Sequence, residues 1–248
     1  MSLNIYPESN GVRDLLTKVN YISRKPVYDY YVEKLSNIEG SILDFGCGDM
    51  PYRQIFKRAK EYIGLDVGTA KEYGFSEKGV VFYNGLDIPF SDERFDCVIS
   101  AQVFEHVQDI DYSIREISRV LKTEGILCFS VPMAYPVHMA PYDFRRFTNY
   151  GLEDLLRKNG FGDIEIKGAN REIDSIRFLK IRMRPKALCQ PYTLFANICF
   201  LYGLKGADRI TIKIENLIRK VLRRSPKKED LLKLPLNYLV YCKKTGGV

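Results

Sequence analysis

Tryptophan is absent from this sequence and histidine is scarce, being limited to His106 and His138. The six cysteines include no Cys-x-x-Cys pair, and most of them lie within apolar runs. Zinc sites usually draw on clustered cysteines and histidines, so we expect no metal site. A small secreted domain would also be dense in disulfides. We therefore interpret the cysteines as reduced core residues.

The sequence also lacks segments that would direct the chain to or across a membrane. No basic stretch followed by an apolar stretch opens the chain, so we expect no secretory signal and a cytoplasmic location. The longest uncharged run, residues 187–204, contains Gln190, Pro191 and Asn197, which argues against a transmembrane helix. With 46% apolar and 28% charged residues among 248, the composition is typical of a soluble globular protein with one main domain.

Positive charge is concentrated in one segment. Residues 171–228 hold 15 Lys and Arg against 4 Asp and Glu, whereas the rest of the chain holds 23 against 27, for a total of +7. The pattern divides the chain into a helical lead-in, 1–40, and a main domain, 41–248. Within the main domain, residues 168–233 form a basic helical insertion or cap.

Three kinds of partner would suit this basic segment: nucleic acid, anionic lipid headgroups at the inner membrane face, or an anionic acceptor such as a phosphate-linked glycan. Aromatic residues cluster in the uncharged run instead of alternating with the basic ones, which disfavours nucleic acid. A surface lying on a membrane, a cover for the substrate cleft, a homodimer contact and an ordinary solvated helical subdomain all remain open.

Short apolar runs alternate with helical patterns and predict an open, doubly wound α/β sheet. Five runs that are apolar almost throughout are typical of buried parallel strands: 41–45, 62–67, 80–84, 95–100 and 125–131. A crossover helix is expected over 110–121 and closed by Gly125, and another from an N-cap at Thr148 to Gly160. Strands follow at 163–168 and 236–244. In the lead-in, Ser23 is expected to cap a helix that has Pro26 near its first turn.

The stretch "SILDFGCGDMPYR", residues 41–53, contains a Gly-x-Gly turn that suits a dinucleotide, S-adenosylmethionine or no ligand at all. A dinucleotide fingerprint needs a third glycine, but Pro51 stands at that position. Asp44, at the end of the strand, would also repel a diphosphate, whereas it suits the ammonium group of S-adenosylmethionine. Pro51 is compatible with the first turn of a helix over 51–59.

A second acid, Asp66, ends the next strand. Its carboxylate can accept hydrogen bonds from both hydroxyls of a ribose. Because NAD also contains a ribose, Asp66 alone does not discriminate between the two cofactors. The pair Asp44 and Asp66 favours S-adenosylmethionine.

Four stretches, "ILDFGCGDM", "IGLDV", "YNGLDIPFSDERFDCVIS" and "EHVQDIDYSIREISRVLKTEGILCFSVP", resemble the successive motifs of class I S-adenosylmethionine-dependent methyltransferases of the methyltransferase-11 type. The resemblance covers roughly residues 40–165. It implies a Rossmann-like sheet of seven strands with the last strand antiparallel. It also implies S-adenosyl-L-methionine as the cofactor, held by Asp44, Phe45, Gly46, Cys47, Gly48, Asp66, Val67, Asn84, Gly85, Leu86, Ala101 and Gln102.

Two positions depart from the family pattern. Asn84 stands where the family usually has an aspartate that receives the adenine amino group, and its amide oxygen can accept the same hydrogen bond. Met50 replaces the third glycine, which changes the packing at that corner. The resemblance further implies that His106 opens the crossover helix and shapes the cofactor pocket.

Methyl transfer from a sulfonium is an in-line displacement, so the acceptor should lie beyond the fifth strand, at the carboxyl edge of the sheet. The loop "VPMAYPVHMAPYDFRRFT" is there, and its candidate catalytic residues are His138, Tyr142 and Asp143. His138 is the preferred general base because imidazole titrates near neutrality. Alternatively, His138 only braces the loop, and Asp143 forms a structural ion pair with Arg145 or Arg146.

The sequence thus predicts a methyltransferase acting on a small-molecule or glycan acceptor. A looser resemblance of "H-x-x-P-Y-D-F-x-R-F-T" to methyltransferases of bacterial surface-polysaccharide clusters suggests O-methylation in that context. The competing hypothesis is a non-catalytic binding module that retains the methyltransferase fold.

Overall fold

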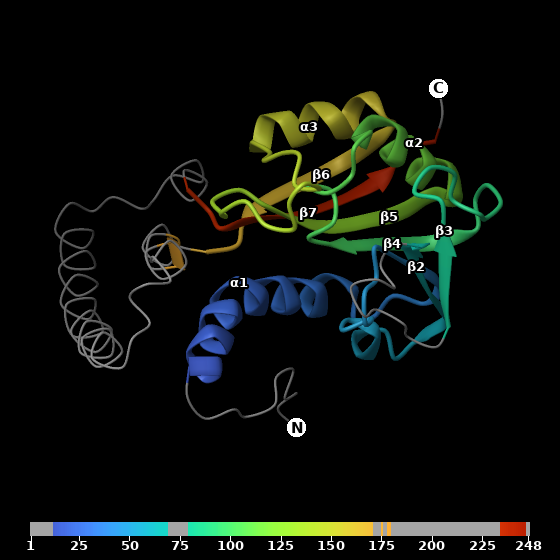
Figure 1. Ribbon diagram of the computed structural model, residues 1–248. Helices are drawn as coiled ribbons and strands as arrows, with labels where there is room; N and C mark the ends of the chain where they lie inside the picture. The colour runs from blue at the N-terminus through green and yellow to red at the C-terminus, as the bar shows by residue number, and fades with distance from the viewer. Residues whose placement is uncertain (1–11, 69–78, 171–174, 176–177, 180–233, 247–248) are drawn as a thin grey trace, which may run out of the picture.

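The computed structural model describes residues 12–68, 79–170, 175, 178–179 and 234–246, and its centre is a seven-stranded sheet (Figure 1). Its strand order is β3-β2-β1-β4-β5-β7-β6. The strands are β1 (Gly40–Phe45), β2 (Ala59–Val67), β3 (Val80–Tyr83), β4 (Phe95–Ala101), β5 (Leu121–Pro132), β6 (Phe161–Gly168) and β7 (Asn237–Lys244).

The pairing of the strands is parallel except at β7. Strand β1 pairs in parallel with β2 and β4, β2 with β3, and β4 with β5. Strand β7 lies antiparallel between β5 and β6. The predicted fold class, including the antiparallel last strand, is therefore confirmed. The carboxyl ends of β1 to β5 all lie at one edge of the sheet.

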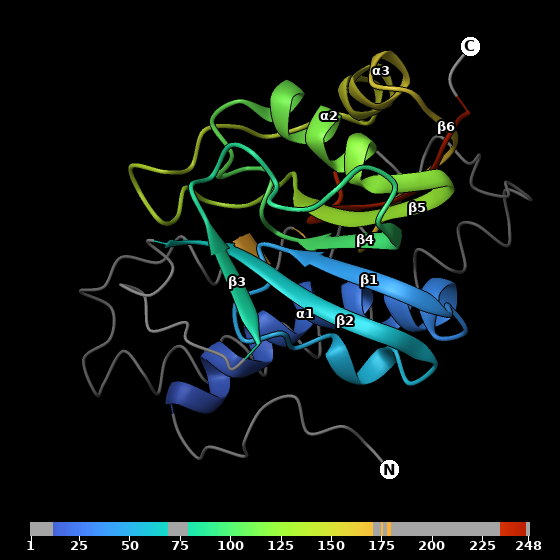
Figure 2. The ribbon, with the colours of Figure 1, turned by 90° about the vertical axis from the view of Figure 1, so that its right-hand side faces the viewer.

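Helices cover both faces of the sheet (Figures 1 and 2). Helix α1 (Val12–Leu35) lies on one face, where Tyr31 and Leu35 pack with Ile42 and Ile99 of the central strands. Helices α2 (Ile110–Val120) and α3 (Asn149–Lys158) lie on the other face. Their buried side chains, Ile114, Ile117, Leu152, Leu155 and Leu156, join the larger core cluster. Burial on both faces explains why the central strands are apolar almost throughout.

Helix α1 is longer than the sequence indicates. Ser23 does not cap it but lies within it and is buried, and Pro26 is also inside the helix. The side-chain amide of Asn237 on β7 donates to both the carbonyl and the hydroxyl oxygen of Ser23, at 3.0 and 3.1 Å. The serine therefore makes a tertiary contact with a strand more than 200 residues away, which no local capping pattern reveals.

The ends of the two other helices test the capping predictions. Thr148 is the N-cap of α3 as predicted, and its hydroxyl accepts from the Gly151 amide at 3.1 Å. Helix α2 is capped by Asp109 and ends at Val120, within one residue of the predicted range 110–121, but its C-cap is Leu121 and not Gly125. The physical reason is strand pairing, because Leu121 already lies opposite Phe95 in the sheet.

No α-helix follows the Gly-x-Gly turn, so the helix predicted over 51–59 is also wrong. Only one short 3-10 helix, η1 (Arg53–Ile55), occurs before β2 begins at Ala59. Met50 has a φ of +51°, a left-handed conformation that glycine adopts at little cost. Its side chain is buried, and its sulfur lies over Gly64 of β2.

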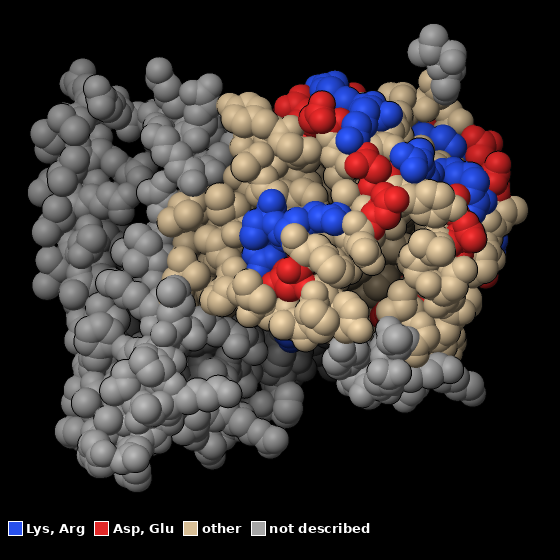
Figure 3. Space-filling view, turned by 45° about the horizontal axis from the view of Figure 1, so that its top comes forward, with Lys and Arg blue, Asp and Glu red and all other residues tan. Residues whose placement is uncertain are grey.

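The basic insertion falls almost entirely outside the described residues, as do Cys189 and Cys199. Of the other cysteines, Cys47, Cys97, Cys128 and Cys242 are buried free thiols, as predicted. No described helix combines the length and apolar character needed to cross a bilayer. Figure 3 shows positive and negative side chains side by side on the described face, in agreement with the ion pairs Arg157–Glu153 and Lys158–Asp111.

The corner beneath the Gly-x-Gly turn yields the first prediction. A Cβ atom on Gly64 would lie 2.7 Å from the Cys47 sulfur and 2.9 Å from the Met50 sulfur. Gly64→Ala should therefore lower the free energy of unfolding by about 1–3 kcal/mol, because this corner is already filled. The control is Gly68→Ala, whose added methyl would meet nothing within 4 Å. Equal urea midpoints for the two variants would contradict the packing described.

Candidate functional site

The carboxylate of Asp44 is buried at the end of β1. Its side chain is among the least exposed of the charged groups, at 2%, and accepts a hydrogen bond from the Tyr62 hydroxyl at 2.5 Å. Burial raises the pKa of Asp44 to about 7, while the hydrogen bond from Tyr62 opposes the shift and the nearby charge of Asp66 adds to it. An incoming cation beside Asp44 would favour the ionised form.

Asp66, at the end of β2, is tied to the Gly-x-Gly turn. One carboxylate oxygen accepts from the Gly48 amide at 2.9 Å and the other from the Val67 amide at 2.8 Å. Burial raises the pKa of Asp66 and these two amides oppose the shift. Since a carboxylate offers about four lone-pair sites, both oxygens can still accept from a ligand.

The other predicted cofactor-binding residues lie along the same edge. Val67 is next to Tyr83 in the β2–β3 ladder. A Cβ on Gly85 would lie 3.4 Å from the Val67 side chain. Gly46 has a φ of +70° and passes so close to Val103 that a Cβ would come within 2.4 Å of it. The turn after β1 and the loop after β4 are therefore in contact.

Four of these residues have side-chain contacts that the sequence does not reveal. The amide oxygen of Asn84 accepts from the Leu86 amide at 2.9 Å, which closes a local turn. Phe45 is buried among aromatic core residues, so only its backbone faces the edge. Cys47 is buried over Gly64. Ala101 ends β4, and Gln102 follows it with its side-chain amide 3.1 Å from the Ser130 hydroxyl.

The loop after β5, residues 133–148, is fastened to the loop after β4, residues 102–109. The Phe144 amide donates to the Glu105 carbonyl at 2.9 Å, and Arg145 donates to the Gln108 carbonyl at 2.7 Å. The ring nitrogen Nδ1 of His106 lies 2.7 Å from the Tyr142 carbonyl. These contacts bring the candidate catalytic loop beside the carboxyl end of β4. His106 lies in the loop after β4 and not at the N-terminus of α2, where the sequence prediction placed it.

Asp143 forms an ion pair with Arg146 and not with Arg145. Its two oxygens lie 2.6 and 2.8 Å from the guanidinium of Arg146. This pairing holds the pKa of Asp143 well below its usual range. The same carboxylate accepts from the His138 amide at 2.9 Å and lies 3.2 Å from its Nδ1. Asp143 therefore orients His138 as well as pairing with Arg146.

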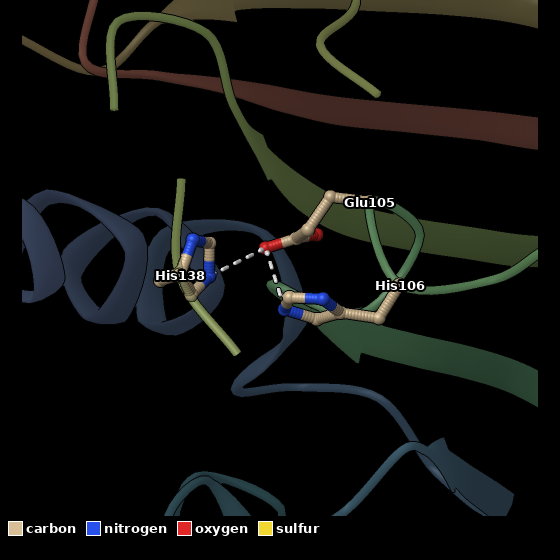
Figure 4. Close-up of side chains that lie close together, drawn as sticks. All are labelled: Glu105, His106 and His138. Atoms are coloured by element: carbon tan, nitrogen blue, oxygen red, sulfur yellow. Dashed lines mark ion pairs between the residues drawn. The ribbon is translucent and has the colours of Figure 1, made fainter. Parts of the chain in front are cut away.

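His138 also faces a carboxylate that the sequence did not single out. Figure 4 shows one oxygen of Glu105, Oε1, directed between the imidazoles of His106 and His138. That oxygen is 3.7 Å from Nε2 of His106 and 3.8 Å from Nε2 of His138. Glu105 is fully buried, and burial raises its pKa to about 8. Burial, followed by the charge of His106, lowers the pKa of His138.

Tyr62 and Glu105 are the two site residues that sequence reasoning missed. Tyr62 lies within an apolar strand, where its ring is expected in the core. Glu105 immediately precedes His106, and a Glu-His pair after a strand is the only local signal of its position. A shallow hollow lined by Met50, Pro51, Arg53 and Gln54 adjoins the Gly-x-Gly turn.

The buried acid Asp44 should make stability depend on pH. Its carboxyl ionises near 3.8 when unfolded and near 7 when folded, so folding takes up a proton between these values and stability falls as the pH rises. Asp44→Asn keeps an acceptor for the Tyr62 hydroxyl. In urea denaturation, this variant should have a free energy of unfolding higher than that of the wild type by on the order of 1–3 kcal/mol at pH 7 and by little at pH 4.

The control for this measurement is Glu153→Gln, an acid-to-amide change on the exposed face of α3. It should show no comparable gain at either pH. A pH-independent difference between Asp44→Asn and the wild type would mean that folding does not raise the pKa of Asp44.

Comparison with known proteins agrees with this geometry. The methyltransferase domain family matches residues 43–129. The ubiquinone biosynthesis O-methyltransferase of Pelagibacter ubique is 26% identical over 185 residues, which cover 63% of this chain and 76% of that protein. The ubiquinone/menaquinone biosynthesis C-methyltransferase of Haemophilus ducreyi is 33% identical over 130 residues, 49% of this chain and 45% of that protein. The chain thus spans about three quarters of the first relative and less than half of the second.

Solved structures share the fold at low sequence identity. A methyltransferase from Archaeoglobus fulgidus has a TM-score of 0.51 at 17% identity and covers 93% of this chain and 94% of its own. A chain from the complex of the Haloferax volcanii Trm112 methyltransferase activator with a methyltransferase has a TM-score of 0.54 at 16% identity, covering 94% and 96%. The matched methyltransferase domain and the relatives named as methyltransferases support a class I S-adenosylmethionine-dependent methyltransferase with S-adenosyl-L-methionine as its cofactor.

Proposed function

We propose that this enzyme transfers the methyl group of S-adenosylmethionine to a hydroxyl group of a small-molecule or glycan acceptor that docks on the loop 133–148. The observation that carries the proposal is the arrangement at the carboxyl edge. Two acids on neighbouring strands, Asp44 and Asp66, flank the Gly-x-Gly turn, and the loop that holds His138 is fastened to the adjoining loop after β4.

Each acid suits one end of the cofactor. Asp44 lies in a low-dielectric site where a cationic ammonium, directly or through water, would favour its ionised form. Asp66 is held by the Gly48 and Val67 amides with lone pairs left for two ribose hydroxyls. Val67, Gly85 and Leu86 would border the adenine, and Leu86 has an exposed apolar side chain for that contact. Asn84 would receive the adenine amino group through its amide oxygen.

The methionyl part of the cofactor would lie along the turn and the end of β4. Gly46, Cys47 and Gly48 would face it with their backbone, as would Phe45, since the Phe45 and Cys47 side chains are buried. Ala101 and Gln102 would complete this side of the pocket.

His138 is proposed to activate the acceptor hydroxyl. Asp143 lies 3.2 Å from Nδ1 of His138 and a carbonyl lies 3.3 Å from the same atom, so Nδ1 carries the proton in the neutral ring and Nε2 carries the lone pair. The methyl transfer itself needs alignment of the acceptor oxygen, the methyl carbon and the sulfur. Tyr142, which is 53% exposed, would contact the acceptor from the same loop.

The loop also indicates what kind of acceptor it would hold. Exposed apolar side chains gather there, including Val137, Met139 and Phe144. One guanidinium nitrogen of Arg145, Nη1, is buried and has no hydrogen-bond partner among the described residues, so it can donate to an anion. An acceptor with an apolar body and a negative charge fits both features, and the basic segment 171–228 supports the same charge preference.

A lipid- or phosphate-bearing glycan precursor used in surface-polysaccharide assembly is one such acceptor, and it would place the enzyme in the cytoplasm at the inner membrane face. Contact with anionic lipid and dimerisation through the basic segment remain sequence predictions. The competing hypothesis of a non-catalytic module predicts cofactor binding without turnover.

Replacement of the second acid tests the cofactor assignment. Asp66→Ala should weaken S-adenosylmethionine binding by about 1.5–3 kcal/mol in calorimetry, because charge-assisted hydrogen bonds to the ribose are lost. The matched control is Asp92→Ala, an exposed acid beyond β3 whose side chain pairs with Arg119. Affinity that is equal in the Asp66 variant and the wild type would remove the ribose role.

Replacement of His138 tests the catalytic assignment. His138→Gln should lower the turnover number by about 100-fold or more, because activation of the hydroxyl is lost. Cofactor affinity should stay within about twofold of wild type, because His138 is not assigned to the cofactor. The assay is formation of S-adenosylhomocysteine with a panel of hydroxylated apolar, anionic and sugar acceptors. Undiminished turnover in the variant would reduce His138 to a brace for the loop.

A further inference from the structure

Three hydrogen-bond acceptors converge inside the protein beside the acceptor loop. The Glu105 oxygen Oε1 and the Nε2 atoms of His106 and His138 all lie within 4.8 Å of one another (Figure 4). The two histidines are partly buried and the glutamate is fully buried. The three residues come from two separate loops, so only the tertiary structure brings them together.

The hydrogen bonds of the two imidazoles determine which nitrogen carries the lone pair. Nδ1 of His106 lies 2.7 Å from the Tyr142 carbonyl, which can only accept, so Nδ1 is the donor. Nδ1 of His138 likewise faces two acceptors, the Pro136 carbonyl and the Asp143 carboxylate. In both neutral rings the lone pair is therefore on Nε2, the atom directed at Glu105.

When Glu105 is ionised, its carboxylate completes a set of acceptors that lacks a donor. Neither oxygen of Glu105 has a hydrogen-bond partner among the described residues, although both are buried. A buried carboxylate without a partner is costly. Two imidazole lone pairs directed at the same carboxylate add repulsion instead of relieving it. A positively charged species held between the three groups would satisfy all of them.

We propose that Glu105, His106 and His138 form a binding site for a divalent transition-metal ion of the zinc class. Two histidines and one glutamate are an established zinc ligand set, and the fourth position is then taken by water or substrate. With bonds of about 2.1 Å, tetrahedral ligand atoms lie about 3.4 Å apart. The observed separations from Oε1 are 3.7 and 3.8 Å and all three ligand atoms lie within 4.8 Å of one another, so an ion would draw the side chains closer together.

The surrounding groups are those that metal-bound histidines usually have. A histidine ligand commonly donates its other ring nitrogen to a carbonyl or a carboxylate, which fixes the ring and makes the ligating nitrogen more basic. His106 donates to the Tyr142 carbonyl, and His138 has the Asp143 carboxylate and the Pro136 carbonyl beside its Nδ1. Arg146 in turn holds Asp143. Contacts at Nδ1 thus fix the orientation of both imidazoles before any ion binds at Nε2.

The sequence prediction of no metal site rested on the scarcity of histidine and the absence of clustered cysteines. Two histidines are enough when a buried glutamate supplies the third ligand. The inference rests on the proposed function and changes one role in it: an ion at this place would coordinate the acceptor hydroxyl and lower its pKa, and His138 would act as a ligand in place of the general base.

Imidazole nitrogen NMR offers a direct test because the chain has only two histidines. Tag-free protein, stripped of metal with a chelator, would be titrated with Zn²⁺ without cofactor or acceptor. One equivalent should shift the Nε2 signals of both rings and leave both Nδ1 protons in place. Mg²⁺ should shift neither, since it prefers oxygen ligands. Co²⁺ should give visible bands of nitrogen and oxygen ligation without a thiolate band.

Two ligand variants and one control complete the test. Glu105→Gln should lower zinc affinity by more than about 100-fold, while its amide can donate to an imidazole and preserve the fold. His106→Gln should do the same and serves if the first variant does not fold. Glu153→Gln, the same change on the surface of α3, should bind as wild type does.

Histidine signals unmoved by excess Zn²⁺, or a Glu105→Gln variant that binds as tightly as wild type, would overturn the inference. The cluster would then be closed by a proton on Glu105. Because these measurements need neither cofactor nor acceptor, their failure would leave the methyl-transfer proposal standing. Unchanged cofactor binding in the Asp66 variant would equally leave the metal-site inference untouched.

Discussion

The parallel pairing of β1 with β2 and β4 is the constraint on which the rest of the structure depends. Parallel strands place all their carboxyl ends at one edge of the sheet. Asp44, Asp66 and the loop after β4 therefore meet at that edge. Strands β1, β2, β4 and β5 each pair on both sides within the sheet, and the loops beyond them present the side chains of the site. The antiparallel β7 then fills the space between β5 and β6 and completes the sheet.

Burial at this edge separates the behaviour of similar side chains. Asp44 and Glu105 are buried with little compensation, and the pKa of each is raised. Asp143 is equally inaccessible but has a two-point ion pair with Arg146, and its pKa is lowered. For both of these acids we propose a bound cation as the missing partner: the cofactor ammonium at Asp44 and a metal ion at Glu105.

Predictions from local sequence patterns were wrong where contacts with residues distant in the sequence determined the backbone conformation. A proline after a glycine turn favours a helix start, yet the chain here makes only a short 3-10 helix because Cys47 and Met50 must pack on Gly64 of β2. Met50 has a left-handed backbone conformation, and its side chain is buried. Similarly, Leu121 leaves the helical pattern because its place in the sheet is opposite Phe95.

The sequence by itself determined the order in which the strands follow one another along the chain, the Gly-x-Gly turn, and the two acids Asp44 and Asp66 at the carboxyl ends of β1 and β2. Runs of apolar residues and the spacing of residues within one segment predict these features, because such patterns reflect the local conformation of the chain. The tertiary structure alone decided that Tyr62 would donate to Asp44 and that Glu105 would lie between two histidines. Those contacts join different strands or loops, and their geometry depends on how the loops cross the edge of the sheet, which no spacing along the chain encodes.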